Sequence, residues 1–251
     1  MVKYRCNRGS LSRSLLTLAE ATASRALGDN RLDHFISPSQ FLRDKLVQYE
    51  VVEPEDITVL PYGINLQAFA PEEGTRSYLL YFGRLAPVKG IMTLLDAIAP
   101  LRHVPLRIVG RGPLEAAVRE RIESQGLDHV TLLGHQSKDS VKELIRDSFA
   151  TCVPSEWYEN YPLSIMESMA MARPVIGTRI GGIPEMIAHE KDGLLVTPGH
   201  PGELREAIAA LARDGDQCKE MGLAARRRAL RHWDVGGHIE RLETVYRQVS
   251  T

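Results

Sequence analysis

Short apolar runs alternate with amphipathic stretches along most of the chain. Because the runs are continuously apolar rather than alternating with polar residues, they indicate β-strands covered on both faces. The six runs after residue 75 are Tyr78–Phe82, Leu106–Val109, Val130–Leu133, Ala150–Val153, Pro174–Ile176 and Leu194–Val196. Apolar residues at helical spacing predict helices between them, over Ile91–Leu101, Pro113–Gln125, Lys138–Asp147, Pro162–Ala172 and Pro184–His189. This order predicts right-handed βαβ units: an α/β fold with a Rossmann-like parallel sheet and helices on both faces.

The sequence before residue 75 is less regular. It predicts two helices, one over Ser14–Leu27 and one from a Ser37 or Ser39 cap to about Tyr49. It also predicts two short strands, over His34–Ile36 and Ile57–Leu60. A polar, proline-containing stretch through Phe69–Gly74 is the preferred domain boundary. Three helices are predicted at the end, over Gly202–Arg213, Gln217–His232 and Val235–Val249. We expect an N-terminal piece with a linker in residues 1–74, a main domain in 75–232, and a final helix in 233–251 that crosses back to the N-terminal part.

Composition narrows the function classes. The 31 Lys and Arg residues nearly balance the 32 Asp and Glu residues, so the basic surplus of a nucleic-acid-binding protein is absent. The three cysteines, Cys6, Cys152 and Cys218, have neither metal-binding spacing nor an evident disulfide pattern. No apolar run is long enough to span a bilayer, and the apolar stretch near the N-terminus is too short for a signal peptide. We therefore expect a cytoplasmic protein.

The loop after the first strand of the main domain carries two cations. Gly83 allows a turn, and Arg84 and Lys89 lie beside the start of the next helix. Fixed cations next to free N–H groups can bind an anion, and a diphosphate is a natural occupant. The loop is neither a Gly-x-Gly-x-x-Gly motif nor a Walker A loop. A solvated loop with two surface cations is the alternative.

Two glycine-rich loops are less specific. Gly110 and Gly112, with Pro113 after them, would permit close approach of a flat ligand or phosphate, although such a sequence is also an ordinary tight turn. Gly181 and Gly182 open the short helix before residue 190 and could form a second anion-binding N-terminus or a flexible turn.

The loop and helix after the fourth strand of the main domain are the most informative stretch. Glu159 is expected in the loop and Glu167 inside the helix. On that helix Glu167 shares a face with Leu163, Ala170 and Met171, which predicts a carboxylate within an apolar stripe. Such a carboxylate is costly unless it is satisfied. It could form a salt bridge or lie at the edge of the helix, or it could accept hydrogen bonds from ligand hydroxyls such as those of a ribose.

Together these motifs resemble the donor-binding half of the retaining glycosyltransferases of family 4, the group 1 transferases with the GT-B fold. The resemblance covers about residues 33–249. The matching stretches are Gly83–Leu85 with Lys89–Gly90, Gly110–Leu114, Glu159 to Glu167 as Glu-x7-Glu, Glu167–Ala170 with Arg173–Ile176, Gly181–Glu185 and Asp192–Leu195.

The resemblance implies a role for each of these residues. Arg84 and Lys89 would neutralise the diphosphate of a UDP-, GDP- or ADP-sugar, Glu159 would hold a hydroxyl of the transferred sugar, and Glu167 would hold the ribose. The two glutamates would then be binding groups rather than the acid and nucleophile of a glycosidase. Further donor-binding positions would be Gly83, Gly110, Gly112, Pro113, Asn160, Tyr161, Pro162 and Leu163. Backbone N–H groups near residues 160–163 would face the diphosphate, and the loops at 110–114 and 134–137 would line the base. No metal is expected.

The resemblance also implies an incomplete enzyme. The family has an acceptor domain before the donor domain, and residues 1–74 resemble only its last part, so we expect the C-terminal half of a GT-B fold with a truncated N-terminal domain. None of the eight histidines takes the family's active-site role. The expected function is retaining sugar transfer to a glycan or lipid-linked acceptor in polysaccharide or glycoconjugate synthesis. It would need the missing acceptor domain or a partner chain, in the cytoplasm or at the inner face of the membrane. The alternatives are a non-catalytic donor-binding or scaffolding subunit, and a GT-B epimerase or phosphorylase.

Overall fold

The computed structural model describes residues 33–250, together with Ser12, residues 15–17 and Ala19. Ser12, residues 15–17 and Ala19 are helical. The rest of the helix expected over Ser14–Leu27, and Cys6, lie outside the described residues. Residues 36–251 form one compact unit and Met1–Phe35 another. The fold below is that of the larger unit.

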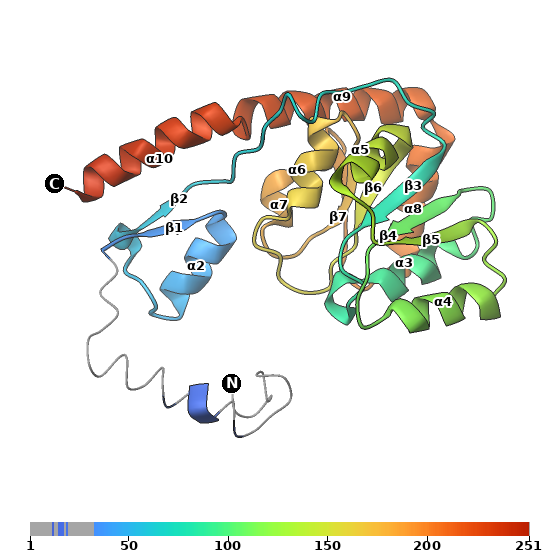
Figure 1. Ribbon diagram of the computed structural model, residues 1–251, viewed down its shortest axis with the longest axis horizontal. Coiled ribbons are helices and arrows are strands. Elements are labelled where there is room, and N and C mark those ends of the chain that lie inside the picture. Colours follow the sequence, from blue (N-terminus) through green and yellow to red (C-terminus); the bar gives the residue numbers. More distant parts are fainter. Residues whose placement is uncertain (1–11, 13–14, 18, 20–32, 251) are drawn as a thin grey trace. The chain divides into compact units, whose positions relative to one another are not determined.

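A six-stranded parallel sheet forms the centre of this unit (Figure 1). Its strands lie in the order β5-β4-β3-β6-β7-β8. Their bounds are β3 Tyr78–Phe82, β4 Leu106–Val109, β5 Val130–Gly134, β6 Ser148–Val153, β7 Val175–Thr178 and β8 Gly193–Val196. This confirms the predicted α/β class with a parallel sheet.

The order of the strands determines where a ligand can bind. The chain builds the sheet outward from β3 to β5, returns to pair β6 with β3, and then continues outward to β8. Neighbouring loops at the carboxyl ends of β3 and β6 therefore lead to opposite sides of the sheet. In open parallel sheets this switch point forms the ligand-binding crevice. The loops after β3 and β6 are the place to look for a site.

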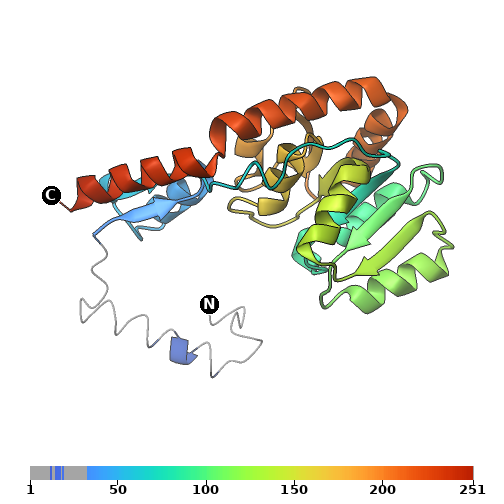
Figure 2. The same cartoon turned by 45° about the horizontal axis from the view of Figure 1, so that its top comes forward.

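Helices cover both faces of the sheet (Figures 1 and 2). Within β3, Leu79 and Tyr81 pack with α3, α4 and α8, whereas Tyr78 and Leu80 pack with α5 on the opposite face. Helices α6 and α7 pack on the face of β7 and β8 that carries Val175 and Leu195. Helix α9 contributes side chains both to this hydrophobic cluster and to the one formed with α3, α4 and α8. The bounds are α3 Ile91–Ile98, α4 Glu115–Ser124, α5 Lys138–Asp147, α6 Leu163–Ala170, α7 Ile183–Met186, α8 Pro201–Arg213 and α9 Gly215–His232. Successive residues of β3 pack on opposite faces because of the period-two geometry of a strand, and both faces are buried.

The segment before the sheet meets the end of the chain. Its elements are β1 Phe35–Ser37, α2 Gln40–Gln48, the 3-10 helix Pro54–Asp56 and β2 Ile57–Val59, and β1 pairs with β2. The Ser39 side chain caps α2. Further on, the Ile64 N–H donates to the Trp233 carbonyl at 2.8 Å, and His238 in α10 (Val235–Val249) hydrogen-bonds the Pro61 carbonyl at 2.8 Å. The linker and the last helix are thus tied together, as Figure 2 also shows.

Some predicted helix boundaries were wrong. The helix expected over Ile91–Leu101 ends at Ile98, since Pro100 has no backbone N–H with which to continue the helical hydrogen bonds. The helix expected over Pro184–His189 covers only Ile183–Met186, because Ile187 is extended. The expected bounds of β3, β4, α5 and α10 are confirmed.

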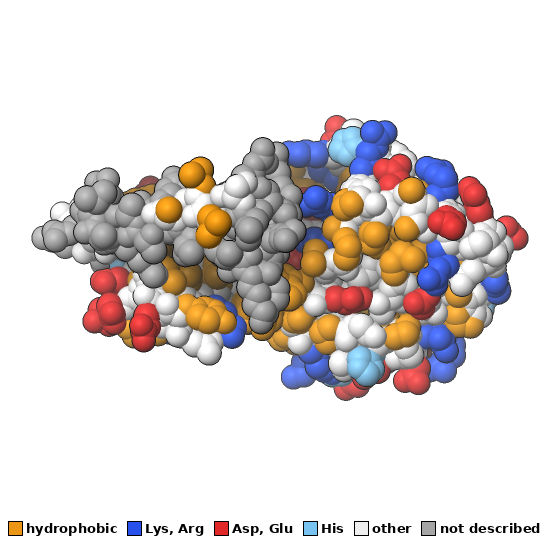
Figure 3. All heavy atoms as spheres, turned by 90° about the horizontal axis from the view of Figure 1, so that it is seen from below, with side chains coloured by type: hydrophobic (Ala, Val, Ile, Leu, Met, Phe, Trp, Pro, Cys, Tyr) orange, Lys and Arg blue, Asp and Glu red, His pale blue; other side chains and the backbone are white. Residues whose placement is uncertain are grey.

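The surface shown in Figure 3 carries acidic and basic side chains interspersed with hydrophobic ones. Among the described helices, none is both long and apolar enough to cross a bilayer.

Candidate active site

The loops after β3 and β6 touch each other directly. After β3 the chain makes a short 3-10 helix, Pro87–Lys89, that ends at Gly90 with a left-handed φ of 66°. A Cβ atom at Gly90 would collide with the Pro154 carbonyl oxygen in the loop after β6. On the same loop, the Glu156 N–H donates to the Val88 carbonyl at 2.9 Å. The switch point therefore joins the two loops into one structure.

Three residues expected to act together do meet there. Arg84, Lys89 and Glu159 line a cavity of about 60 Å³ at the ends of β3 and β6, and Gly83 and Pro162 line it too. Lys89 Nζ lies 2.5 Å from Glu159 Oε1. Without a ligand, the carboxylate thus neutralises one of the two cations.

The position of Glu159 is fixed by its surroundings. Ser155, only 1% exposed, donates its Oγ–H to Glu159 Oε1 at 2.6 Å. The Ser155 carbonyl in turn accepts from Thr178 Oγ1 at 2.7 Å, and Thr178 ends the next strand, β7. The Gly182 N–H donates to the Glu159 carbonyl at 2.7 Å. Ser155 holds the carboxylate itself, whereas Thr178 and Gly182 fix the backbone of its loop, so the cavity is preorganised rather than a mobile loop surface.

Glu167 lines a second and larger cavity, of about 410 Å³. The other lining residues are Phe69, Phe82, Gln136, Lys138, Asp139, Val141 and Lys142. Burial raises the pKa of Glu167, and the positive charges of Lys138 and Lys142 partly offset that rise. Phe82, the last residue of β3, lines both cavities. The cation-lined cavity and the Glu167 cavity therefore adjoin at the end of the central strand.

The expected apolar stripe around Glu167 was only partly right. Ala170 and Met171 are buried, but Leu163 is 52% exposed. The buried face of α6 is formed by Ile165, Met166 and Met169 against α7 and α9. Glu167 therefore lies at the edge of the buried face and opens toward the cavity rather than into the core.

Residues 160–163 were expected to face the donor through their backbone N–H groups, and the Tyr161 side chain points elsewhere. The ring is buried, and the indole Nε1–H of Trp233 donates to the Tyr161 hydroxyl at 2.7 Å. The two rings pack edge to face with centroids 6.2 Å apart. The Tyr161 side chain thus anchors the junction of α9 and α10. Asn160 and Leu163 are exposed, so within residues 160–163 only Pro162 lines the cation-lined cavity.

Gly110 and Gly112 each have a structural requirement for glycine in the fold itself. Gly110 has a φ of 136°, and a Cβ there would collide with the Gly83 carbonyl oxygen. At Gly112 a Cβ would collide with the Leu85 carbonyl oxygen. These glycines let two loop backbones approach each other, and together with Pro113 they line neither cavity described above.

Gly181 and Gly182 do not form a second anion site. The Gly182 N–H is already bonded to Glu159, and the Ile183 N–H donates to the Ile180 carbonyl at 3.3 Å. Gly181, with φ of 61°, lies against the Glu159 backbone. The pair supports the Glu159 loop instead.

Sequence reasoning missed Phe82, Ser155, Lys138 and Lys142. Phe82 and Ser155 each lie at or just after the carboxyl end of a sheet strand, so a strict search of strand ends would have found them. The two lysines belong to α5, and no local signal shows that this helix borders the cavity.

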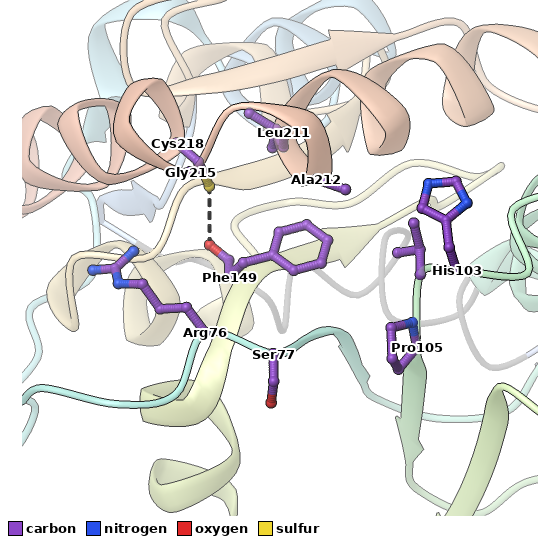
Figure 4. A pocket seen from close by; sticks show the side chains of 10 residues that line it. Arg76, Ser77, His103, Pro105, Phe149, Leu211, Ala212, Gly215 and Cys218 are labelled. Carbon is purple, nitrogen blue, oxygen red and sulfur yellow. Dashed lines mark hydrogen bonds between the residues drawn. The ribbon is translucent and has the colours of Figure 1, made fainter.

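A third cavity, of about 180 Å³, lies at the opposite edge of the sheet (Figure 4). Its lining includes Arg76 and Pro105, which precede β3 and β4, and Phe149 near the start of β6. Cys218 donates to the Phe149 carbonyl there at 3.3 Å. Since ligands of parallel sheets bind at the carboxyl ends, this cavity is not the candidate active site. Over the described residues no group of three His, Cys, Asp or Glu side chains is placed to hold a metal ion.

Comparisons with known proteins agree with this geometry. The family described as "Glycosyl transferases group 1" matches residues 65–228. The D-rhamnosyltransferase WbpZ of Pseudomonas aeruginosa is 30% identical over 232 residues, which cover 86% of this chain and 59% of that protein. The first curated relatives are covered over 46%, 45% and 59% of their length, so the chain spans about half of them.

Solved structures share the fold. Anabaena HepE in complex with UDP-glucose superimposes with a TM-score of 0.80 at 22% identity, over 87% of this chain and 65% of that one. The C-terminal domain of the group 1 glycosyltransferase LpcC from Francisella tularensis is covered completely by 69% of this chain, with a TM-score of 0.63 and 19% identity. The sheet therefore has the fold of a C-terminal domain from this family. The match over residues 65–228 shows that the chain belongs to the group 1 glycosyltransferases.

Proposed function

We propose that this chain binds a nucleotide-sugar at the β3/β6 switch point and takes part in transferring the sugar, with retention of configuration, to a glycan or lipid-linked acceptor. The observation that carries the proposal is the pair of adjoining cavities. One presents Arg84, Lys89 and Glu159, the other presents Glu167, and Phe82 lies between them. A diphosphate, its sugar and its nucleoside need such neighbouring polar and apolar compartments.

Arg84 and Lys89 bind the diphosphate in this proposal. Charge-assisted hydrogen bonds from fixed cations stabilise the negative charge that grows on the leaving diphosphate as the glycosidic bond breaks. Donor binding separates Lys89 from Glu159, since a phosphate oxygen takes the place of the carboxylate. Glu159 is then free to accept a hydrogen bond from a hydroxyl of the transferred sugar, while Ser155 keeps the carboxylate in position.

Glu167 accepts the ribose hydroxyls, and the base lies in the 410 Å³ cavity against Phe82 and Val141. UDP, GDP and ADP all carry the ribose diphosphate that this arrangement recognises. The fold neighbour that binds UDP-glucose makes UDP the first nucleotide to test. Two side-chain cations supply the charge for the diphosphate, so donor binding needs no metal ion.

The domain assignment follows from this role. Residues 75–232 bind the donor, residues 1–74 form the acceptor side with the linker, and residues 233–251 return to it. The chain spans about half the length of these relatives. In this proposal complete transfer uses an acceptor domain or a partner chain. We place the activity in the cytoplasm, free or at the inner face of the membrane. The second candidate is a donor-binding or scaffolding subunit.

The test is calorimetry with UDP, GDP and ADP, first with and then without a chelator. Glu167→Ala should weaken the binding of the preferred nucleotide by about 1–3 kcal/mol, the scale of lost hydrogen bonds to a charged group. Glu115→Ala, which removes a partly exposed glutamate on α4, is the matched control and should leave the affinity unchanged.

The results separate the possibilities. Unchanged affinity in Glu167→Ala would contradict the ribose assignment. Loss of binding on chelation would contradict the metal-free site. Binding of a nucleotide without turnover of any nucleotide-sugar would favour the subunit.

A further inference from the structure

Exposed aromatic side chains lie beside the candidate active site. Trp157 is 62% exposed and Tyr158 is 51% exposed, and both belong to the loop after β6. Tyr158 packs on Phe41 of α2, and Tyr49, just after α2, is 68% exposed. We call Phe41, Tyr49, Trp157 and Tyr158 the aromatic ridge. Contiguous exposed apolar groups of this kind on a soluble protein usually mark a binding surface.

The ridge is held in one arrangement. The Tyr158 ring centroid lies 4.9 Å from that of Phe41 and 5.5 Å from that of Trp157, in tilted pairs. Lys45 Nζ lies 5.8 Å from both the Tyr49 and the Tyr158 ring centroids. Such offset contacts between rings and with a cation stabilise their relative positions.

The helix that carries Phe41 is itself anchored to α7. The backbone N–H groups of Gln40 and Phe41 donate to the carboxylate of Glu185, on α7, at 2.8 and 2.7 Å. A preformed surface binds without first having to order its own side chains.

The ridge begins next to the donor cavity. Trp157 is only two residues before Glu159, so their Cα atoms are at most about 7 Å apart. Glu159 faces Lys89 in the cation-lined cavity, and its loop is fixed by Ser155. Group transfer requires the acceptor within contact distance of the donor sugar. This closeness along the chain is the ground for placing the acceptor on Trp157.

The chemistry of the ridge favours a sugar ring over a hydrocarbon chain. A pyranose has an apolar C–H face, which packs on an aromatic face, and a rim of hydroxyls. The Trp157 indole N–H, the Tyr hydroxyls and the Lys45 ammonium can hydrogen-bond such a rim. A hydrocarbon would instead cover these polar groups without satisfying them, which is costly.

We propose that the aromatic ridge is the acceptor subsite, and that Trp157 stacks on the pyranose ring that receives the transferred sugar. The inference rests on the proposed function, because it takes Glu159 as the group next to the transferred sugar. It assigns the acceptor a carbohydrate at its reactive end, whatever is attached beyond it.

The chain allows a direct optical test, since it has two tryptophans and they differ in environment. Trp157 is 62% exposed and Trp233 is 1% exposed. With UDP present, tryptophan emission is titrated with methyl α-glycosides of glucose, mannose, galactose and rhamnose, each to 0.5 M, and with 1-hexanol as an apolar probe. At least one glycoside should give a saturable blue shift, because a stacked sugar excludes water from the exposed indole. Trp157→Phe should abolish that shift and leave the Trp233 emission unaltered.

The affinity test uses matched variants. Trp157→Ala should weaken binding of the responding glycoside at least tenfold, and Tyr246→Ala should not change it, since Tyr246 on α10 is also 62% exposed. A response to hexanol but to no glycoside, or a glycoside response that persists in Trp157→Phe, would overturn the proposal. UDP binding, measured separately by calorimetry, should be equal in all these variants. Its absence from the unmodified chain would count against the proposed function, whereas UDP binding without any glycoside response counts against the ridge alone.

Discussion

A half-buried carboxylate such as Glu167 lowers the stability of the fold when it is charged. Burial raises its pKa above the ordinary value of 4.5. The folded state then holds the proton more tightly than the unfolded state. Stability from this group is present below the ordinary pKa and is lost as the pH rises through the raised pKa. At neutral pH the charged Glu167 therefore destabilises the fold, and the proposed contact with ribose hydroxyls would offset this loss.

The first prediction concerns this carboxylate. Glu167→Gln keeps the shape and removes the charge, so its melting temperature should exceed that of the unmodified chain near pH 7, and the difference should shrink toward about pH 4. Thermal melts followed by circular dichroism across this range measure the effect. Glu115→Gln should show no such pH-dependent gain. An unmodified chain that is as stable as Glu167→Gln near neutral pH would contradict the assigned burial.

Side-chain direction was the part of the site that the sequence could not supply. The sequence could predict that loops at neighbouring strand ends meet, because the carboxyl ends of parallel strands lie together. This brings together Arg84, Lys89 and Glu159. Tyr161 was not, since its hydroxyl bonds Trp233, 72 positions away. Gly110 likewise lies so close to the Gly83 carbonyl of another loop that no Cβ atom fits there. These partners are set by tertiary structure, and no local pattern encodes them.

Among the elements, the two loops at the switch point depend on each other through one glycine. Gly90 needs its left-handed backbone to continue into α3, and it also needs an absent side chain to pass the Pro154 carbonyl. Strand and helix bounds were mostly predictable because apolar periodicity is local. The contact between these loops was not, because it follows from the pairing of β3 with β6.

The second prediction separates the two demands on Gly90. Gly126 also has a left-handed φ, of 55°, but no atom lies within 4 Å of a Cβ placed there. Gly126→Ala should therefore lose only the conformational term, about 1–2 kcal/mol. Gly90→Ala should lose more, and it should also weaken nucleotide binding by moving Lys89 away from the cavity. Chemical denaturation gives the first quantity and calorimetry the second. Equal losses in the two variants would show that the loop contact contributes nothing.

For the molecule as a whole, Trp233 joins parts that are far apart in the sequence. Its backbone carbonyl accepts from Ile64 in the linker, its indole donates to Tyr161 beside α6, and its side chain packs in the core with α7 and α9. The predicted parallel sheet did not by itself reveal the strand order, and that order is what places this junction and the switch point.

The third prediction follows from this junction. In a Trp157→Phe background Trp233 is the sole fluorophore of its kind, and its unfolding curve in urea should coincide with the loss of helical circular dichroism. Coincident transitions are the mark of one cooperative unit. An earlier fluorescence transition would show instead that the linker and α10 detach before the sheet unfolds.

The Glu185 carboxylate gives α2 a cap that belongs to another part of the fold. Both of its oxygens hold the first backbone amides of α2, Gln40 and Phe41. A movement of α2 away from α7 would therefore free these two amides as it opens the space beside the Glu159 loop. The hinge motion and the fraying of the first turn of α2 would then occur together. Hydrogen exchange at those two amides would report the opening rate, and a nucleotide that keeps the two parts together would slow both amides equally.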